Sequence, residues 1–363
     1  MSITIKDVAR AANVSYSTVS RALKNSPKIS AKTKEKIRRI AKELNYIPNA
    51  VARELSSQKT TTVGFIYNIG THKSNLDPIM EGIEETVAKE GFQLLSFNSR
   101  ENLKTEHNYL RFLHEKRAEG ILIFPVITEE GSNLSYLKSL IKGNIPVVVI
   151  DRYFPELDTD YVVSDNFGGA YEATAHLIKL GHRRIGYITG QEYQTSVHDR
   201  LEGYKKALED HRIIYQKELI KKVAPKLPSS IEEGWRATKD LLKERPTAIF
   251  TYNEIATVGA LKAIREEGIN VPEDLAFIGF DEVAVASHIF MPLTVVVQQA
   301  YKIGEMGARM IIERVKHLHQ KKDCLETRHI SVRTKLLVRD SCGAKLKGRV
   351  KVNLEGDLDG FNS

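Results

Sequence analysis

Three polar side chains near residue 20 have the types and the spacing to contact the edges of DNA bases. Tyr16, Ser17 and Arg21 lie on the outward side of one short predicted helix, and Arg21 follows Ser17 by four residues. An arginine can hold O6 and N7 of guanine with two hydrogen bonds, which discriminates by about 1–3 kcal/mol. The side chains expected to contact phosphates, which supply affinity but no sequence information, are Lys24, Lys28, Lys32 and Thr33.

Three short helices are predicted to position these side chains. Thr4 and Asp7 have the spacing of a capping box for a helix through about Ala12, and Ser15 is a good N-cap for a second helix that ends near Asn25. A third helix is predicted from about residue 31 to residue 44. Two helices joined by a tight turn match the helix-turn-helix geometry, in which the second helix enters the major groove. The residues expected to share the small core are Val8, Ala9, Ala12, Val14, Val19, Leu23, Ile29, Ile37, Ile40 and Leu44.

The positive charge of the chain is concentrated in this N-terminal head. Residues 1–62 carry 13 Lys and Arg against 4 Asp and Glu, whereas the remaining residues carry 41 against 42. A basic head on a neutral body points to a polyanion-binding module joined to a second function. A solvated basic tail would have the same charge, but the periodic apolar residues and turns indicate that the head folds.

A second helical pattern, from about residue 49 to residue 56, follows the head. It covers only about two turns, and a helix of that length is marginal in water unless DNA or a partner chain supports it. Three motifs here and in the head make the chain resemble the lactose/galactose repressor (LacI/GalR) family of bacterial transcription regulators. They are Ile5-Lys6-Asp7-Val8-Ala9, Val14-Ser15-Tyr16-Ser17-Thr18-Val19-Ser20-Arg21-Ala22-Leu23 and Asn45-Tyr46-Ile47-Pro48-Asn49-Ala50-Val51-Ala52-Arg53-Glu54-Leu55.

The resemblance implies that the third motif is a hinge helix, which folds on operator DNA and pairs with its twin in a dimer. In the family this helix pushes a leucine into the minor groove. Leu55 matches that leucine, with Ala52 as its companion in the groove, and apolar wedges of this kind kink the duplex. The alternative for Leu55 is a plain amphipathic anchor. The contacts to the DNA backbone expected from the resemblance are Thr4, Ser15, Lys24, Lys28, Thr33, Tyr46 and Asn49.

From residue 62 onward, apolar runs of strand length alternate with helical patterns. Strands are predicted near 63–67, 93–97, 121–124 and 147–150, and a second set near 161–164, 184–188, 219–223, 247–252 and 275–279. The helices between them are predicted near 77–90, 103–117, 134–142, 167–180, 198–210, 232–244 and 255–267. Two successive β/α sets imply two doubly wound α/β subdomains with a cleft between them. In such sheets, ligands bind outside the carboxyl ends of the strands.

The sequence lacks the usual features of enzymes, metalloproteins and membrane proteins. It contains no GxGxxG after the first strand, no GxxxxGK[ST], no GxSxG and no HExxH, so we expect no catalytic residue. The histidine pairs 176/182 and 317/319 have no companions at metal-ligand spacing, and two cysteines are too few for a cluster, so neither metal nor cofactor is expected. No apolar run could span a bilayer and the N-terminus is charged, which predicts a cytoplasmic protein. The family resemblance implies that this cytoplasm is bacterial and that the protein is nucleoid-associated.

The resemblance continues through about residue 340 and implies the fold of periplasmic sugar-binding proteins. Matching stretches include 145–152, 165–170, 200–204 and 278–281. Four polar positions match effector contacts of the family: Asp165, Arg200, Asn253 and Asp281. Carboxylates that accept from hydroxyls and an arginine fork suit a small polar effector, such as a sugar, a sugar phosphate or a sugar acid. Each of the four could instead be a helix cap or a tie between subdomains.

The expected domain organisation follows from the same resemblance. It comprises a head (1–47), a hinge helix and linker (48–61), an effector-binding core (62–340) and a C-terminal tail (341–363). Within the core, the N-subdomain is expected at about 62–160 and 293–323, and the C-subdomain at about 161–292 and 324–340. The chain would then cross between subdomains near 160–164, 290–294 and 323–328.

The chain departs from the family pattern where the ligand would lie. Many relatives carry Asn-Pro-Phe-Phe after the first strand, and those aromatic rings stack on the ligand. This chain has Lys73-Ser74-Asn75-Leu76 there, and Ser229 falls near a second position where relatives often place an aromatic residue. The departures disfavour a simple sugar ring and favour a phosphorylated or acidic ligand, or a protein corepressor.

These patterns predict a sequence-specific, ligand-responsive transcriptional regulator, expected to repress a carbohydrate or related catabolic operon. It would bind a palindromic operator as a homodimer, because two heads on a palindrome require two-fold symmetry. The tail lacks the leucine heptads with which some relatives form tetramers. The alternatives are a regulator controlled by a protein corepressor, an enzyme on a doubly wound scaffold, and a non-specific nucleoid-type protein.

Overall fold

The computed structural model describes residues 3–23, 25–46, 61–68, 75–224, 231–283, 291–320 and 325–345. The chain divides into two compact units, with the boundary between residues 60 and 61, and each unit is described by itself. The predicted DNA contacts Lys24, Asn49, Ala52 and Leu55 lie outside the described residues.

The first unit contains the three predicted helices. They are α1 (Ile5–Ala12), α2 (Tyr16–Leu23) and α3 (Ala31–Glu43). The expected caps are present: the Asp7 carboxylate accepts a hydrogen bond from the Thr4 amide at 2.9 Å, and Ser15 Oγ accepts from the Thr18 amide at 3.2 Å. Residues from all three helices form one small core. Its fully buried members are Val8, Ala12, Val19, Ala22 and Ile37.

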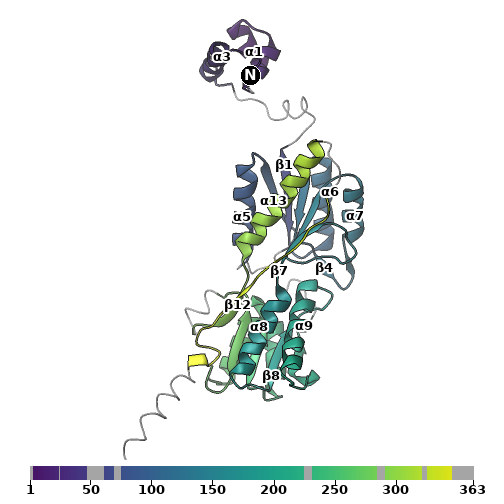
Figure 1. Ribbon diagram of the computed structural model, residues 1–363, viewed down its shortest axis with the longest axis vertical. Helices are drawn as coiled ribbons and strands as arrows, with labels where there is room; N and C mark the ends of the chain where they lie inside the picture. Colours follow the sequence, from purple (N-terminus) through teal and green to yellow (C-terminus); the bar gives the residue numbers. More distant parts are fainter. Residues whose placement is uncertain are drawn as a thin grey trace, which may run out of the picture. The chain divides into compact units, whose positions relative to one another are not determined.

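The second unit is built on two six-stranded sheets, shown in separate halves of the ribbon in Figure 1. In the first sheet all strands are parallel, in the order β13-β7-β6-β3-β1-β2. Its strands are β1 (Thr62–Tyr67), β2 (Gln93–Asn98), β3 (Gly120–Ile123), β6 (Val147–Ile150), β7 (Asp160–Ser164) and β13 (His329–Val332). We call this sheet and its helices the first half. A hairpin of β4 (Ile127–Thr128) and β5 (Gly131–Ser132) follows β3.

The second sheet has the order β14-β12-β11-β10-β8-β9, parallel except for the edge strand β14. Its strands are β8 (Ile185–Thr189), β9 (Ile220–Lys222), β10 (Ala248–Thr251), β11 (Ala276–Phe280), β12 (Thr294–Val297) and β14 (Lys335–Leu337). We call this sheet and its helices the second half. The central strands β8, β10 and β11 are buried at every position, as expected of parallel strands covered on both faces.

Helices cover both faces of each sheet. In the first half, α5 (Leu76–Lys89) and α13 (Ala300–His319) share one core, while α6 (Leu103–Glu115) and α7 (Leu134–Lys142) share the other. In the second half, α8 (Asn166–Lys179) and α9 (Thr195–Asp210) cover one face, and α10 (Ile231–Leu242) and α11 (Glu254–Glu266) cover the other. Helices α5 and α13 approach so closely that a Cβ at Gly304 would lie 2.1 Å from the Ile79 carbonyl oxygen. Two doubly wound α/β halves were predicted, and the structure contains them.

In the described part of the chain, three passages lead from one half to the other, as predicted, and each lies slightly later in the sequence than expected. Strand β7 pairs with β6 and β13, so residues 161–164 belong to the first half and the chain crosses after Ser164. Strand β12 belongs to the second half, so the second crossing follows Val297 rather than residues 290–294. The third crossing lies at residues 333–334 rather than 323–328, between β13 and β14. An apolar run predicts a strand but does not say with which sheet it pairs.

The first residues of the C-terminal tail expected at 341–363 are part of the second half. Ser341 and Cys342 are fully buried, and the Ser341 hydroxyl donates to the Phe277 carbonyl at 2.7 Å. The Cys342 side chain packs with α8 and Ala344 packs against the same core, so the core extends to residue 344. The described helices include none that combines the length and the hydrophobicity needed to cross a membrane.

Candidate DNA-binding surface and ligand site

Helix α2 presents the predicted base-contacting residues at the surface of the first unit. Val19 and Ala22 are buried in its core, which leaves Tyr16 65% exposed and Arg21 also exposed. Ser17 is partly buried, and its hydroxyl lies 2.8 Å from that of Ser15. The Arg21 guanidinium makes no hydrogen bond or ion pair with the described residues, so it is available for an acceptor such as a guanine edge.

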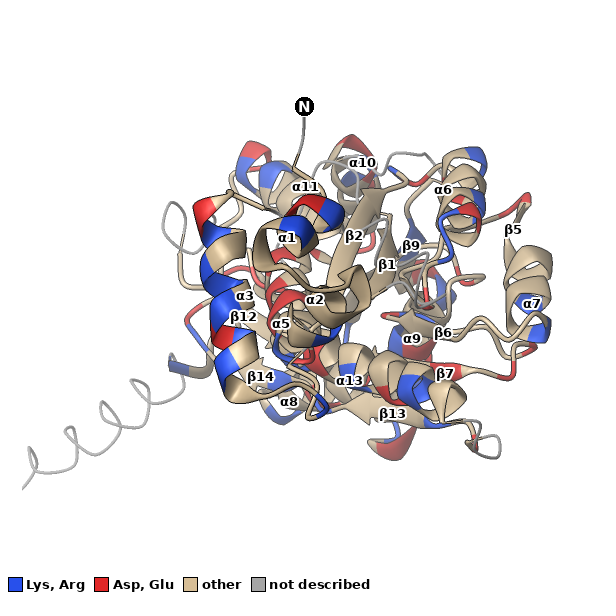
Figure 2. Ribbon diagram, turned by 90° about the horizontal axis from the view of Figure 1, so that it is seen from above, with Lys and Arg blue, Asp and Glu red and all other residues tan. Residues whose placement is uncertain are grey.

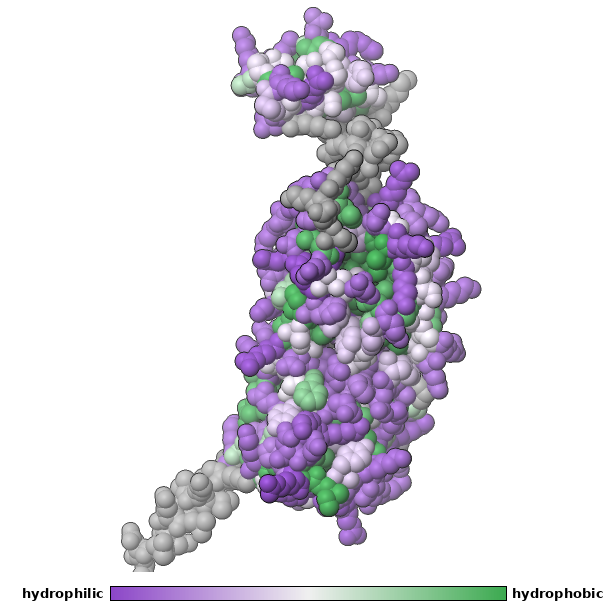
Figure 3. Space-filling view, turned by 45° about the vertical axis from the view of Figure 1, so that its right-hand side comes forward, coloured by the Kyte–Doolittle hydropathy of each residue, from purple (hydrophilic) through white to green (hydrophobic). Residues whose placement is uncertain are grey.

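The predicted backbone contacts of the head lie mainly at helix N-termini. Thr4, Ser15 and Thr33 occupy the first turns or caps of α1, α2 and α3, where free amide groups and the helix dipole favour a phosphate. Lys28 is exposed between α2 and α3, whereas Tyr46 is partly buried against the head core. Helix α3 carries six of the ten Lys and Arg residues that the structure describes in the first unit (Figure 2), and the face of the first unit in Figure 3 is mostly hydrophilic.

In the second unit, two predicted effector residues meet directly. Asp281 follows β11 and Arg200 lies on α9, and Arg200 Nη1 is 3.6 Å from Asp281 Oδ2. The Arg200 side chain is only 6% exposed and is held firmly. Its Nε donates to Asn166 Oδ1 at 2.8 Å, its Nη1 donates to the Tyr252 carbonyl at 2.5 Å, and its guanidinium carbon lies 3.6 Å from the Phe280 ring centroid.

The other two predicted effector residues cap helices. Asp165 follows β7, and its Oδ1 accepts from the Gly168 amide at 2.8 Å at the start of α8. Asn253 follows β10, and its Oδ1 accepts from the Ala256 amide at 2.8 Å at the start of α11. Both are partly buried. One side-chain oxygen of each residue therefore caps a helix, which was the alternative considered for them. The role of Asp165 and Asn253 as ligand contacts stays a prediction.

Two residues of the first half approach the same place, and the sequence analysis assigned them no role. Asp151 and Arg152 directly follow β6, and burial raises the pKa of Asp151 while both Arg152 and Arg200 lower it. Burial lowers the pKa of Arg152, and its Nε lies 3.6 Å from Asp151 Oδ2 without forming a hydrogen bond. A nearly buried guanidinium whose Nε has no hydrogen-bond partner is unusual in a folded protein. Both residues could have been identified as site candidates from the sequence, because they lie at the carboxyl end of a predicted strand.

Gln298 and Asn75 complete the surroundings of Asp281. Gln298 Nε2 donates to Asp281 Oδ1 at 2.7 Å, and Ser164 Oγ donates to Gln298 Oε1 at 2.5 Å. Asn75 Nδ2, from the first half, donates to the same Asp281 oxygen at 2.8 Å. Carboxylates, amides and arginines from both halves thus converge at the carboxyl ends of the parallel strands, where doubly wound sheets bind ligands.

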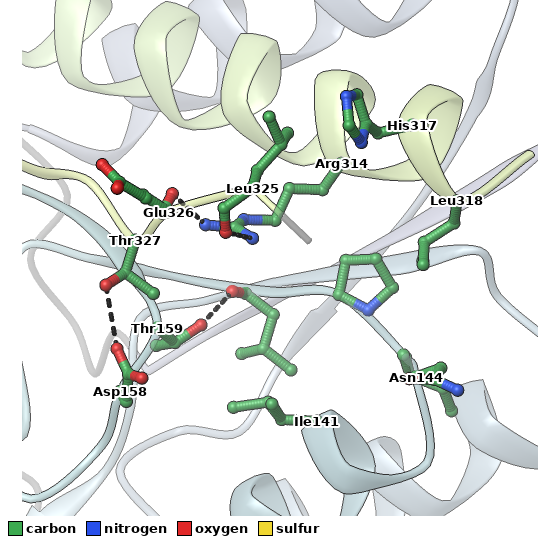
Figure 4. A pocket seen from close by; sticks show the side chains of 13 residues that line it. Ile141, Asn144, Asp158, Thr159, Arg314, His317, Leu318, Leu325, Glu326 and Thr327 are labelled. Atoms are coloured by element: carbon green, nitrogen blue, oxygen red, sulfur yellow. Dashed lines mark hydrogen bonds between the residues drawn. The ribbon is translucent and has the colours of Figure 1, made fainter. Parts of the chain in front are cut away.

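A cavity of about 620 Å³ lies at the opposite edge of the first sheet, at the amino ends of β6 and β7. Figure 4 shows Arg314 reaching into it from α13, beside Glu326. Arg314 is engaged there: Nε and Nη2 donate to the two oxygens of buried Asp160 at 2.6 and 2.7 Å, and Nη1 donates to the Leu325 carbonyl. The side chain therefore ties α13 to β7 and does not leave a cation free for a ligand.

A helix-turn-helix head followed by two doubly wound halves with converging polar groups defines a class of protein: a DNA-binding regulator with a ligand-binding core. Comparisons with known proteins agree. Residues 4–49 match the model for bacterial regulatory proteins of the lacI family, and residues 174–342 match the periplasmic binding protein-like domain.

Relatives match almost the whole chain. The HTH-type transcriptional repressor PurR of Haemophilus influenzae (strain PittEE) is 32% identical over 340 residues, which cover 93% of this chain and 98% of that protein. The transcriptional regulator DegA of Bacillus subtilis is 36% identical over 310 residues, covering 85% and 89%. The ribose operon repressor of Haemophilus influenzae is 33% identical over 316 residues, covering 86% and 92%. The chain belongs to the lacI family of bacterial transcriptional regulators.

Solved structures extend the comparison to the fold. The complex of the regulator CelR with cellobiose has a TM-score of 0.69 and 28% identity, and it covers 93% of this chain and 99% of its own. The lac repressor dimer bound to operator and the anti-inducer ONPF has a TM-score of 0.78 at 24% identity, covering 94% and 99%, which shows the shared fold. The predicted family, the fold class and the role as a DNA-binding transcriptional regulator with a ligand-binding core are confirmed.

Proposed function

We propose that this regulator represses a carbohydrate or related catabolic operon, as a homodimer on a palindromic operator, under the control of a small polar effector. Helix α2 would enter the major groove, with Arg21, Tyr16 and Ser17 at base edges and the capped N-termini of the head helices at phosphates. The hinge contacts Leu55 and Ala52 are proposed for the minor groove. We propose a binding protein of the bacterial cytoplasm rather than an enzyme.

The convergence of both halves on one polar site is the observation that supports effector control. Arg200 and Asp281 of the second half lie within electrostatic range of Asp151 of the first half. Arg152 adds a guanidinium whose Nε has no hydrogen-bond partner, and a ligand oxygen would satisfy it. A ligand rich in hydroxyl groups, with or without an acidic group, can donate to the carboxylates and accept from the arginines. Asp165 and Asn253 are the further proposed contacts.

Such a ligand would act by contacting both halves at once. Because a ligand shifts an equilibrium only through its different affinity for two states, contacts to both halves would favour one relative arrangement of them. We propose that this arrangement sets the spacing of the two hinge segments across the dimer and so decides whether they pair in the minor groove.

Operator binding in the presence of candidate effectors tests the proposal. Selection of bound genomic fragments would first identify the operator, and its affinity would then be measured with D-ribose, cellobiose, their phosphates and the corresponding sugar acids. We expect one of these chemical classes to change operator affinity in the parent protein, and Arg200→Met to abolish the change while retaining operator binding. A response that survives in Arg200→Met places the effector elsewhere. Control by a protein corepressor would appear as operator binding that no small molecule alters but a cell extract does.

A further inference from the structure

Asn75 occupies a position where an asparagine ordinarily caps a helix, but its side chain points to the other half. Asn75 is the N-cap residue of α5, and it makes no side-chain hydrogen bond to that helix. Its Nδ2 donates instead to Asp281 Oδ1 at 2.8 Å. Asn102, the N-cap of α6 in the same half, behaves in the ordinary way, because its Oδ1 accepts from the Thr105 amide at 2.8 Å. The contact of Asn75 therefore replaces a local cap with a bond between the two halves.

We infer that Asn75 is a latch, which holds the two halves together through Asp281 when no effector is bound. Oδ1 of Asp281 already accepts from Gln298 as well as from Asn75, so both of its lone pairs are used. Oδ2 lies toward Arg200. An effector hydroxyl that bonds Oδ1 must therefore displace one of the two amides. Asn75 is the amide that comes from the other half, so its displacement alters how the halves are held.

The latch differs from three other polar contacts that the described residues make between the halves. The Thr195 hydroxyl bonds the backbone of Tyr153, at 3.1 Å to its amide and 3.3 Å to its carbonyl, and Gln194 Nε2 donates to the Ile127 carbonyl at 3.5 Å. Both of these contacts end on backbone atoms, and the third, from Ser164 Oγ to Gln298 Oε1 at 2.5 Å, ends on an amide oxygen. The Asn75 contact ends on the carboxylate proposed to bind the effector, so it is the contact through which a ligand would compete directly.

The chain itself provides the contrast with its relatives. Asn75 stands in the segment where the family resemblance drawn from the sequence implies an aromatic residue that stacks on the ligand, and this chain has Lys73-Ser74-Asn75-Leu76 there. A ring gives a ligand an apolar face, whereas the Asn75 amide gives Asp281 a hydrogen bond before any ligand arrives. We expect the unliganded halves to be held in one arrangement more firmly than an aromatic residue at this position would allow. The inference deepens the proposed function, because it concerns regulation at the same site.

Distance measurements on the full chain without DNA or effector test the latch directly. Spin labels would be placed at Lys138→Cys on α7 and Lys179→Cys on α8, two exposed positions in different halves, after replacement of Cys324 and Cys342 by alanine. Chains with one label supply the distances between copies, which are subtracted. Four proteins are compared: the parent, Asn75→Ala, Asn75→Asp and the control Asn102→Ala.

We expect one narrow distance distribution for the parent and for Asn102→Ala, and a second population for Asn75→Ala. A hydrogen bond to a charged group supports a change of about tenfold or more in the ratio of the two populations. Asn75→Asp should shift the ratio further, because it restores a good helix cap but places a carboxylate against Asp281. The latch is refuted if Asn75→Ala matches the parent, or if Asn102→Ala changes the distribution as much as Asn75→Ala does. Because no effector is used, this failure would leave the proposed function untouched.

Discussion

Asp151 and Asp281 occupy corresponding positions in the two halves, and both have a left-handed backbone. Each directly follows a central parallel strand, β6 or β11, and their φ angles are 72° and 75°. A non-glycine residue in this region costs about 1–2 kcal/mol, and such residues concentrate at functional sites. The turn places a carboxylate of each half near the same arginine: burial raises the pKa of Asp151 and the Arg200 charge offsets part of that rise, while Arg200 lies 3.6 Å from Asp281. Each half thus places a carboxylate in the site with the same left-handed turn after a central strand.

Arg21→Ala should relax sequence preference at one base pair of each operator half-site, at a cost of about 1–3 kcal/mol for that contact. The reason is that Arg21 is exposed on α2 without an ion-pair partner among the described residues. Lys28→Ala is the matched control, because loss of a phosphate contact weakens binding to all sequences alike. Binding to a randomised operator library measures both effects. If Arg21→Ala weakens every sequence equally, Arg21 contacts the backbone.

Arg152→Met should cost the unliganded protein clearly less stability than Arg200→Met. Arg152 is nearly buried, forms one ion pair with Asp151 at 3.6 Å and makes no hydrogen bond at Nε, so its replacement should lower the free energy of unfolding only a little. Arg200 bonds Asn166 and the Tyr252 carbonyl, so Arg200→Met should lower the free energy of unfolding by about 3 kcal/mol. Urea denaturation of both variants measures this contrast. Equal destabilisation by the two variants would contradict a ligand role for Arg152, because Arg152 would then be a structural residue.

Glu106 should make the protein less stable as the pH rises from about 4.5 to 7. Burial raises its pKa to about 7, against the hydrogen bonds from Asn133 and the Val126 amide and the nearby Arg152 charge. Between the unfolded pKa and the folded pKa, the folded state binds the extra proton, so stability falls with increasing pH and levels off above 7. The shift corresponds to about 3 kcal/mol at most. Unfolding at several pH values should show this slope in the parent and its loss in Glu106→Gln.

Arg314→Leu should destabilise the first half by about 3–5 kcal/mol, because the fully buried Asp160 loses its two-fold bond to Arg314 and keeps only the Arg328 guanidinium, at 3.9 Å, as a cation. The double variant Asp160→Val with Arg314→Leu should cost less than the two single variants together, since both charges are then removed. Thermal unfolding of the three variants forms a double-mutant cycle. Additive costs would mean that the two residues stabilise the protein independently.

The sequence predicted the local elements well, because each depends on residues close together in the chain. The three head helices appear within two residues of their predicted ends, and the caps at Thr4 and Ser15 are those expected. The pairing of β7, β12 and β13 could not be predicted in the same way. Only β7 was predicted as a strand; its apolar residues suit a buried strand in either half, and only the packing of the complete sheets decides between them. No strand was predicted over β12 or β13, and β13 has a single buried residue, Val332.

The candidate site was predicted only in part, for a similar reason. Arg200 and Asp281 were found through family motifs, and the structure brings them together. Asp151, Arg152 and Gln298 went unassigned although they follow strands β6 and β12 directly. Asn75 was named only as part of a segment that lacks the family's aromatic residue. Its hydrogen bond to Asp281 could not be predicted, because the two residues are 206 positions apart and no local sequence pattern indicates such a contact.

The two strands β13 and β14 stand at one edge of each sheet and are separated by only two residues. Each sheet therefore lacks one of its two edge strands until the last described stretch of the chain has been synthesised. That stretch supplies the missing strand of both sheets. The head, by contrast, contains all its core residues within the first 46 positions. During synthesis the head is complete long before either half of the core can close. A messenger truncated before the codon of residue 329 would encode a chain with a whole DNA-binding head and a core that lacks both β13 and β14.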